Sequence, residues 1–477
     1  MKKRYYVLLF IVAVLFVILN SLGTIFYGFN GNIDSCIFNT IGKYWSEGYL
    51  PYISLYDHKG PLIFFINMLS WKFFNCERGI LLFQVISVFS SLVFLMKIAM
   101  LKLGNIKKSI AFTVLTLGYL VITYFGGNMT EEYCLPFLIA TMYFNLKYLK
   151  NYTENKIVKH SMKHAFFYGI SFSVCFLTRL TNSISILIGI IVITFILIKK
   201  KEYKEIIKNA LCFIGGFLML TIPFVVYFTY NNAFYEFLDA TLLFNIKYAS
   251  KSASWLLKEN LLTQIVKFLI YFFPSYCMIP IGYSKIKKGH KEVGIYYILL
   301  GIFEVLLFAS NRMFRHYGTI ILPNFLIILL EIEALKLKSI IKKTIYATVI
   351  FVSLFCCVVF AKNQLKKTFR TDLYDNVILS LNSEDKNSFI MWNGNVEIYE
   401  YYNIKPYYKY FVTQDWHASF SDEISKDMYN TFYSGDVKYI LFVGDIQNSL
   451  IRDVINERYE IVKSVENLNL YRIKYDE

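Results

Sequence analysis

Long apolar segments separated by short polar loops make up the first three quarters of the chain. Windows of 17 to 23 nearly uncharged residues recur between Tyr6 and Ala361. Each window is long enough to cross the ~30 Å hydrocarbon core of a bilayer, because a helix rises ~1.5 Å per residue. The pattern predicts a polytopic α-helical membrane protein.

The distribution of Lys and Arg predicts how these segments are oriented. Lys2, Lys3 and Arg4 precede the first segment, which is longer than a signal peptide and lacks a small-residue cleavage site, so we expect a retained anchor. Basic clusters recur in alternate loops, and the positive-inside rule places them in the cytoplasm. The N-terminus is then cytoplasmic and the tail after residue 361 is extracytoplasmic. The eleven spans that satisfy this rule lie near residues 6–27, 79–101, 109–125, 133–149, 164–178, 183–198, 209–230, 261–283, 293–310, 317–335 and 344–361.

One apolar run does not fit this series. Pro61–Phe74 has 14 residues, about 21 Å as a helix, which is too short to span the bilayer upright. Counting it as a span would also invert every later loop. We therefore expect an interfacial or re-entrant helix within a first outer loop that covers residues 28–78.

The tail from Lys362 to Glu477 has a different character. It carries 14 Lys and Arg against 18 Asp and Glu, whereas the preceding 361 residues have a net charge of +20. Segments 388–392, 437–443 and 468–473 have the pattern of strands, and 450–459 has that of a helix. We expect two domains, a membrane domain at 1–361 and a small extracytoplasmic α/β domain at 362–477.

Composition excludes several classes of protein. With 56% apolar and 18% charged residues, the 477-residue chain is neither a set of soluble domains nor disordered. The net charge of +16 arises from the short loops of the membrane part, which is typical of topology determinants rather than of nucleic-acid binding. The eight cysteines include no CxxC pair, so the sequence indicates neither a zinc site nor a disulfide framework.

The first outer loop holds the most informative residues. Apolar side chains at helical spacing predict an amphipathic surface helix over 33–47, with Asp34 in its first turn. The block 57–61 (DHKGP) then starts the next helix at its proline. Lys59 beside exposed backbone N–H groups is a ready anion site, and the obvious anion at a membrane surface is a lipid phosphate. Sugar transfer from a polyprenyl phosphate needs a cation on that phosphate and one carboxylate that takes the acceptor's proton, and Lys59 and Asp34 suit these roles.

These motifs resemble the bacterial branch of the GT-C glycosyltransferases, which includes the dolichyl-phosphate-mannose protein mannosyltransferases and the lipid A aminoarabinose transferases. The likeness covers most of residues 1–330 and is strongest around Asp34 and the 57–61 block. Gly126–Tyr133 and Arg315–Tyr317 also resemble outer-loop motifs of that family. The resemblance implies that Asp34 is the catalytic base and that Lys59 contacts the carrier phosphate. Many relatives have a second acidic residue where this chain has Ser35, which weakens the case for a metal-assisted or paired-acid mechanism.

Other polar residues of the predicted outer loops have two interpretations each. Asp34 itself would favour a helix N-terminus. Asp57 is either catalytic or orients its neighbours His58 and Lys59. Glu131 and Glu132 either bind substrate or a divalent cation, or favour a helix N-terminus. The remaining candidates either contact phosphate or lie at helix ends and lipid headgroups: Arg179, Arg312, Arg315, His316 and Tyr317.

The sequence therefore predicts an integral membrane glycosyltransferase of a bacterial plasma membrane. Its partners would be a polyprenyl-phosphate-linked sugar donor, a cell-envelope glycan or lipid acceptor and membrane lipids, but no nucleic acid. No organic cofactor is indicated, and a divalent cation stays open. The alternative is a flippase, exporter or polymerase of lipid-linked saccharides, which Glu304, the one carboxylate deep in a span, would favour. Against it, the polar residues gather on one face and show no repeat. A purely structural anchor would leave that gathering unexplained.

Overall fold

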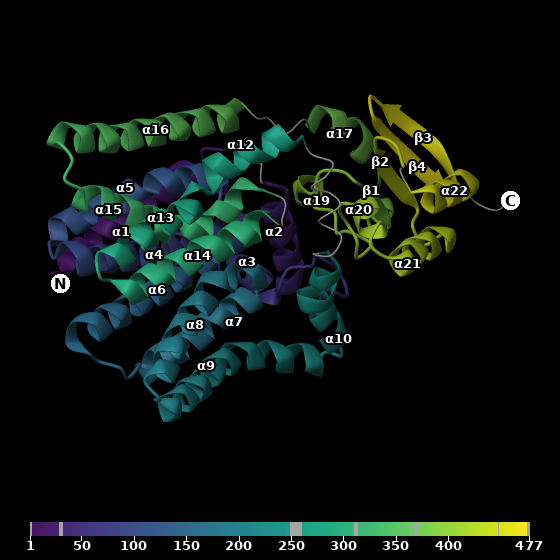
Figure 1. Ribbon diagram of the computed structural model, residues 1–477. Coiled ribbons are helices and arrows are strands. Elements are labelled where there is room, and N and C mark those ends of the chain that lie inside the picture. The colour runs from purple at the N-terminus through teal and green to yellow at the C-terminus, as the bar shows by residue number, and fades with distance from the viewer. Residues whose placement is uncertain are drawn as a thin grey trace.

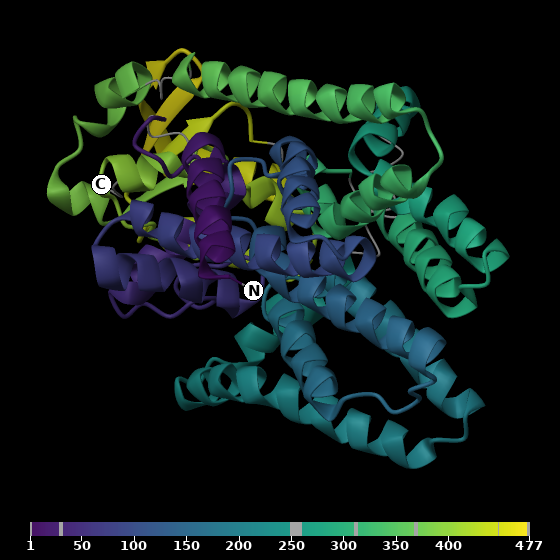
Figure 2. The same ribbon diagram turned by 90° about the vertical axis from the view of Figure 1, so that its left-hand side faces the viewer.

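The computed structural model describes residues 2–27, 32–248, 260–309, 313–366, 371–446 and 448–474. A bundle of helices that contains the N-terminus fills one end of the molecule, and a small sheet lies at the other end (Figure 1). The long helix α16 runs along one edge of the bundle and α9 along the opposite edge (Figure 2). The helices that correspond to the predicted spans are α1 (Lys3–Asn20), α4 (Ile80–Leu103), α5 (Ile106–Thr123), α6 (Thr130–Asn155), α7 (Met162–Phe176), α8 (Ile184–Lys199), α9 (Tyr203–Tyr230), α12 (Leu261–Tyr271), α13 (Phe273–Lys287), α14 (Lys291–Ala309), α15 (Leu322–Ala334) and α16 (Ser339–Lys366).

In the described part of the chain, fewer helices than the eleven predicted spans have the length and hydropathy of a plain span. Within the described residues, eight are long and apolar enough, or nine if α12 and α13 form one span bent by 61°. The predicted count of eleven is therefore not confirmed. The helix α7 has only 15 residues, and the 26 residues of α6 include acidic and basic side chains near both ends, so neither has the length and hydropathy of a plain span.

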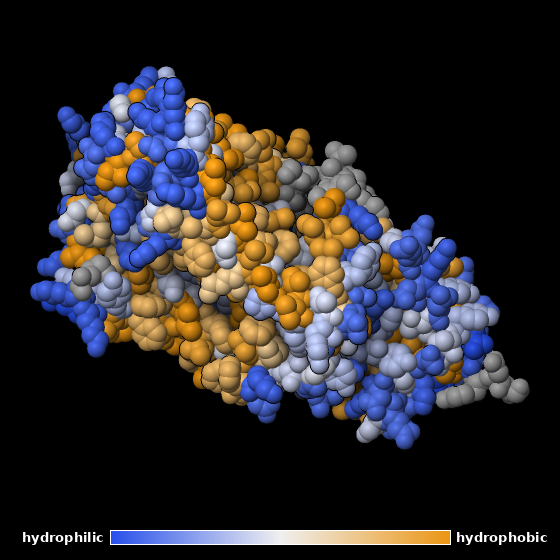
Figure 3. Space-filling model, turned by 90° about the horizontal axis from the view of Figure 1, so that it is seen from below, coloured by the Kyte–Doolittle hydropathy of each residue, from blue (hydrophilic) through white to orange (hydrophobic). Residues whose placement is uncertain are grey.

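An apolar band surrounds the helices on the face seen from below, and it separates two polar ends (Figure 3). Large apolar side chains of α8 and α9 are exposed on this bundle, among them Ile191, Phe195, Ile214 and Met219. An apolar surface of this extent is stable in lipid rather than in water. The chain is thus a multi-pass α-helical membrane protein.

Two helices of the first outer loop lie between the bundle and the sheet, α2 (Ile33–Ser46) and α3 (Pro61–Phe74) (Figure 1). The side chain of Asn32 caps α2 by accepting a hydrogen bond from the backbone N–H of Ser35 at 2.8 Å. Pro61 occupies the first turn of α3, where its missing N–H costs no hydrogen bond. Both helices form where the sequence predicts them.

The C-terminal segment contains a four-stranded sheet in the order β1-β2-β4-β3, in which only β1 and β2 are parallel. Three of the strands and α22 match the predicted segments. The strand β3 was not predicted, because its side chains from Glu460 to Ser464 are all exposed and lack a two-residue alternation. The elements of this segment are α17 (Thr371–Ile378), α18 (Ser383–Lys386), β1 (Phe389–Trp392), α19 (Glu397–Tyr401), α20 (Gln414–Ala418), α21 (Asp422–Tyr433), β2 (Tyr439–Val443), α22 (Ser449–Arg458), β3 (Tyr459–Val465) and β4 (Leu468–Ile473).

One apolar core joins this segment to the first outer loop. Buried side chains of α2 and α3, such as Phe38 and Phe64, belong to the same cluster as those of the sheet, such as Phe389 and Leu441. The orientation of α2 is therefore set both by α3 and by the C-terminal sheet. The division into domains at residue 361 stays a prediction, and α16 continues past it to Lys366. Five short elements complete the fold: η1 (Glu77–Gly79), η2 (Leu180–Ser183), α10 (Phe234–Leu238), η3 (Asp239–Leu243) and η4 (Arg315–Ile321).

Candidate functional site

A cavity of about 430 Å³ lies where α2, the loop before α3, the start of α6, η2 and η4 meet. Segments far apart in the sequence contribute its wall, including the helical segment at 241–248. Seven of the predicted site residues share this one cavity. They are Asp34, His58, Lys59, Glu131, Arg179, His316 and Tyr317.

Asp34 projects into the cavity from the first turn of α2. The helix cap is formed by Asn32, so the carboxylate of Asp34 is not used for capping. Among the residues that the structure describes, this carboxylate accepts no hydrogen bond and forms no ion pair. Asp34 is therefore free to accept a hydrogen bond or a proton from a bound molecule.

Backbone contacts hold the loop that carries Lys59 against the segment that carries Arg179. The N–H of Gly60 donates to the carbonyl of Thr178 at 3.0 Å, and that of Leu62 donates to the carbonyl of Leu177 at 2.9 Å. A Cβ atom at Gly60 would lie 2.3 Å from the Leu177 carbonyl, so this approach requires glycine. The glycine of the DHKGP block thus places two cations beside the same cavity.

Asp57 contacts Lys59 and is not part of the cavity wall. Its Oδ1 accepts a hydrogen bond from the backbone N–H of Lys59 at 2.9 Å and lies 3.5 Å from Nζ. Burial opposes the charged ammonium, but the carboxylates of Asp57 and Asp34 outweigh it and raise the pKa of Lys59. The ammonium stays protonated at neutral pH. This geometry favours a positioning role for Asp57 over a catalytic one.

His58 lies against aromatic side chains of the helical segment 241–248 and of α20. Its ring centroid is 5.5 Å from those of Phe244 and Trp416. Burial, and then the charge of Lys59, lower the pKa of His58 well below its usual value, so the ring is neutral. Its Nε2 lies 3.2 Å from Nζ of Lys59 and accepts a hydrogen bond from it. The C-terminal segment thus helps to fix the lysine.

Arg179 and Glu131 form an ion pair in the cavity wall. Nη1 of Arg179 donates to Oε1 of Glu131 at 2.9 Å, and the Glu131 side chain is 1% exposed. The guanidinium carbon lies 3.7 Å from the centroid of the Tyr317 ring, a cation–π contact. The ring of His316 lies 4.5 Å from that of Tyr317. A second fixed cation therefore faces the cavity.

The structure does not bring Glu132 or Arg315 to this cavity. The carboxylate of Glu132 is buried, and it accepts hydrogen bonds from the hydroxyl of Tyr124 at 2.5 Å and from the backbone of Asn128 at 2.7 Å. The guanidinium of Arg315 lies 4.5 Å from the ring centroid of Phe125. The predicted contact Arg312 falls outside the described residues.

A metal site beside Asp34 would need a free carboxylate from Glu131 or Glu132 of α6. Glu132 is engaged elsewhere, and Glu131 is paired with Arg179. Across the described ranges, no group of three or more His, Cys, Asp or Glu side chains is placed to hold a metal ion. These residues therefore do not fit a divalent cation at this position.

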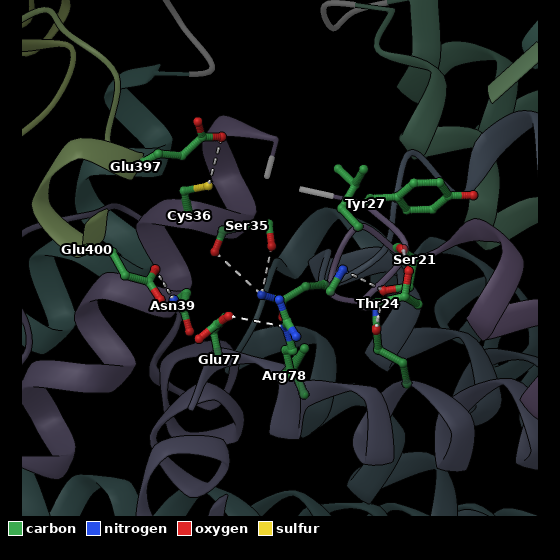
Figure 4. A pocket seen from close by; sticks show the side chains of 16 residues that line it. Ser21, Thr24, Tyr27, Ser35, Cys36, Asn39, Glu77, Arg78, Glu397 and Glu400 are labelled. Atoms are coloured by element: carbon green, nitrogen blue, oxygen red, sulfur yellow. Dashed lines mark hydrogen bonds and ion pairs between the residues drawn. The ribbon is translucent and has the colours of Figure 1, made fainter. Parts of the chain in front are cut away.

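A second cavity, of about 70 Å³, lies on the other side of α2 (Figure 4). There α2 presents Asn39, whose Nδ2 donates to Oε2 of Glu400 at 2.7 Å. Burial and the neighbouring carboxylate of Glu77 raise the pKa of Glu400 to about 8. Cys36 of α2 also contacts Glu397 in this cavity. These contacts tie α2 to the C-terminal segment.

The sequence analysis did not predict that the helical segment 241–248 contributes to the cavity wall. Thr241, Asn245 and Tyr248 line the larger cavity, and Nδ2 of Asn245 donates to the carbonyl of His58 at 2.8 Å. The sequence offered one signal, because residues 231–260 lie between the predicted spans 209–230 and 261–283 and therefore on the outer face. A loop without a periodic pattern does not indicate which of its polar side chains turn inward.

Comparisons with known proteins place this chain in a family. The family model described as "Putative competence-induced protein Ccs4 N-terminal domain" matches residues 1–348. The chain belongs to this family. No curated protein matches it in sequence.

Two solved structures share the architecture of this family member. ArnT from Cupriavidus metallidurans, solved with bound undecaprenyl phosphate, has a TM-score of 0.59 at 10% identity, with 98% of this chain and 97% of that chain covered. The oligosaccharyltransferase AglB from Archaeoglobus fulgidus, solved with an inhibitory peptide and a dolichol-phosphate, has a TM-score of 0.53 at 10% identity, with 92% and 69% covered. The GT-C fold that the sequence motifs predicted is confirmed. At this identity, the likeness concerns the fold alone.

Proposed function

We propose that this protein is an integral membrane glycosyltransferase that transfers a sugar from a polyprenyl phosphate to an extracytoplasmic cell-envelope acceptor. One observation carries the proposal. The carboxylate of Asp34, which has no hydrogen-bond or ion-pair partner among the described residues, shares a single cavity with two fixed cations, Lys59 and Arg179. This combination of a free base and an anion clamp is what transfer from a lipid phosphate requires.

The reaction divides the cavity into two roles. The donor phosphate binds to the ammonium of Lys59 and the guanidinium of Arg179, which Asp57 and Glu131 hold in place. The acceptor hydroxyl oxygen attacks the anomeric carbon while the bond from that carbon to the phosphate oxygen breaks. The electron pair leaves with the polyprenyl phosphate, and the proton of the hydroxyl passes to Asp34. His58, His316 and Tyr317 exclude water around the cations. By family analogy the configuration at the anomeric carbon inverts.

The bound lipids of the structural relatives support this choice of donor. ArnT was solved with undecaprenyl phosphate and AglB with a dolichol-phosphate. We propose the same ligand class for this chain. The topology that we propose has the cavity and residues 362–477 on the outer side of a bacterial plasma membrane and the N-terminus in the cytoplasm.

Glu304, the residue that favoured the transporter alternative, is held by hydrogen bonds between helices. Oε2 of Glu304 accepts hydrogen bonds from Oγ of Ser275 at 2.8 Å and from Nδ2 of Asn324 at 2.6 Å. These contacts join α14 to α13 and α15, and they give the carboxylate the partners that burial demands. These contacts therefore indicate that Glu304 stabilises helix packing rather than a transport path.

The test uses purified full-length protein in detergent. Radiolabelled undecaprenyl-phosphate sugars are incubated with a cell-envelope extract, and both labelled acceptor and released undecaprenyl phosphate are measured. We expect acceptor labelling that matches the release, without a sealed membrane. Movement of the lipid-linked sugar across sealed vesicles, with no transfer in detergent, would identify a flippase and overturn the proposal.

A further inference from the structure

A second large cavity, of about 330 Å³, lies between α7, α8 and α9, away from the candidate site. The helices α7 and α9 pack closely, because a Cβ atom at Gly169 would lie 2.0 Å from the carbonyl oxygen of Phe213. The cavity fills the space beside α8. Its wall is mostly apolar, and it includes Leu187, Ala210 and Ile214, which are exposed on the apolar side of the bundle. The cavity therefore opens toward lipid.

One polar atom in this wall lacks a partner. His160, in the loop between α6 and α7, is 5% exposed and lines the cavity. Its Nδ1 lies 2.9 Å from Oδ1 of Asn209. Its Nε2 is buried and has no hydrogen-bond partner in the described part of the chain. A buried polar atom of this kind calls for a bound group.

The hydrogen bonds around His160 decide what that group must offer. Nδ2 of Asn209 donates to the carbonyl of Glu205 at 2.7 Å, which turns Oδ1 toward the histidine. Nδ1 of His160 therefore carries the proton and donates it. Burial also lowers the pKa of His160, which keeps the ring neutral. Nε2 is thus an acceptor, and its missing partner is a hydrogen-bond donor.

The surroundings exclude other occupants. Among the described residues that line the cavity there is no Lys or Arg, so an anionic headgroup would be buried without a counter-charge. A single water molecule, which takes up about 30 Å³ of liquid, cannot fill this cavity, whose wall is apolar apart from His160, Tyr168, Thr194 and Asn209. The volume falls within the ~300–1,000 Å³ typical of small-molecule sites. An apolar chain that ends in a hydroxyl satisfies all of these constraints.

We propose that this cavity binds a long-chain lipid alcohol, whose hydroxyl donates a hydrogen bond to Nε2 of His160 and whose chain lies between α8 and α9. The site goes beyond the proposed transfer reaction and does not depend on it. In the predicted topology it lies in the cytoplasmic half of the bundle, whereas the larger cavity faces the outside.

Binding is measured with purified full-length protein in a detergent that has no hydroxyl groups. The ligands are hexadecanol, its methyl ether and hexadecyl phosphate. We expect hexadecanol to bind roughly tenfold more tightly than the methyl ether, which cannot donate a hydrogen bond. Equal affinity of alcohol and ether for the unaltered protein, or tightest binding of the phosphate, would overturn the proposal without any variant.

Two histidine variants assign the preference to one atom. His160→Phe keeps a ring but removes the acceptor, so we expect equal affinity for alcohol and ether. His290→Phe is the matched control, because His290 lies in the loop between α13 and α14 and does not line the cavity. It should keep the tenfold preference. Ala210→Trp, which fills the mouth, should abolish binding of both ligands. A preference that survives His160→Phe would refute the assignment.

Discussion

The ion pair between Arg179 and Glu131 leads to a prediction with two opposite signs. Glu131→Gln preserves the shape of the side chain but removes its charge. The guanidinium, whose side chain is 18% exposed, then faces an amide oxygen in place of a carboxylate and keeps its contact with the Tyr317 ring. The protein should become less stable, while the cavity becomes more positive. If Arg179 binds the donor phosphate, the affinity for that phosphate should therefore rise.

The magnitudes follow from the burial of the pair. Breaking a buried ion pair costs ~3–5 kcal/mol, and the retained amide oxygen places Glu131→Gln near the lower value. A phosphate bound to Arg179 would lie about 6 Å from the Glu131 carboxylate, because each would be one charge-assisted contact of ~2.8 Å away from the same guanidinium. At an effective dielectric constant of about 20, the repulsion is about 3 kcal/mol. Screening in an open cavity reduces this value, so we expect roughly a tenfold gain in affinity.

The assay combines thermal unfolding in detergent with equilibrium binding of radiolabelled undecaprenyl phosphate. Glu132→Gln is the matched control, because its carboxylate is buried in the opposite direction against Tyr124 and Asn128. That variant should also lower the unfolding temperature, but it should leave the affinity unchanged. A loss of affinity in Glu131→Gln would mean that Glu131 itself contacts the ligand. An unchanged affinity would place the phosphate away from Arg179.

Four further outcomes are expected. Asp34→Asn should lower sugar transfer by roughly 10²–10⁴ with donor binding intact, and transfer at the unaltered rate would remove Asp34 from the role of base. Lys59→Met should weaken binding of undecaprenyl phosphate by roughly 10- to 100-fold, the worth of a charge-assisted hydrogen bond; titration of the two proteins side by side checks this. Gly60→Ala should force the loop away from Leu177 and lower both the unfolding temperature and donor affinity, and a variant with normal values of both would contradict the required close approach. Burial lowers the pKa of His417 to about 4, so an unfolded chain binds a proton there that the folded chain does not. Its contribution of about 3 kcal/mol is present above pH 6.5 and is lost as the pH falls toward 4, and the unfolding temperature of His417→Asn should depend less steeply on pH across that window.

The sequence was informative wherever a local pattern determines the structure. Apolar length and Lys and Arg placement located the helices of the bundle, because each such segment partitions into lipid by itself. The bounds of α3 follow from its proline and from its mostly apolar run of 14 residues. The spacing of apolar side chains located α2 and placed Asp34 in its first turn.

The limits of the sequence appear in the number of spans and in β3. Whether α6 and α7 cross a bilayer depends on how neighbouring helices cover the polar ends of α6 and the short length of α7. A window of consecutive residues contains no information on these neighbours. The strand β3 pairs with β4 at the edge of the sheet, and that pairing, rather than any alternation of its own side chains, makes it a strand.

By itself, the sequence determined that the chain is a polytopic membrane protein and which residue types its outer loops offer. Only the tertiary structure decided which of them meet. Consecutive residues of a helix point about 100° apart, so Glu131 turns to Arg179 while Glu132 turns to Tyr124. Lys59 and Arg179 are distant in the chain, and they share a cavity because the backbone at Gly60 packs against that at Leu177 and Thr178. Such long-range packing depends on the shape of both partners, and a local pattern records only one of them.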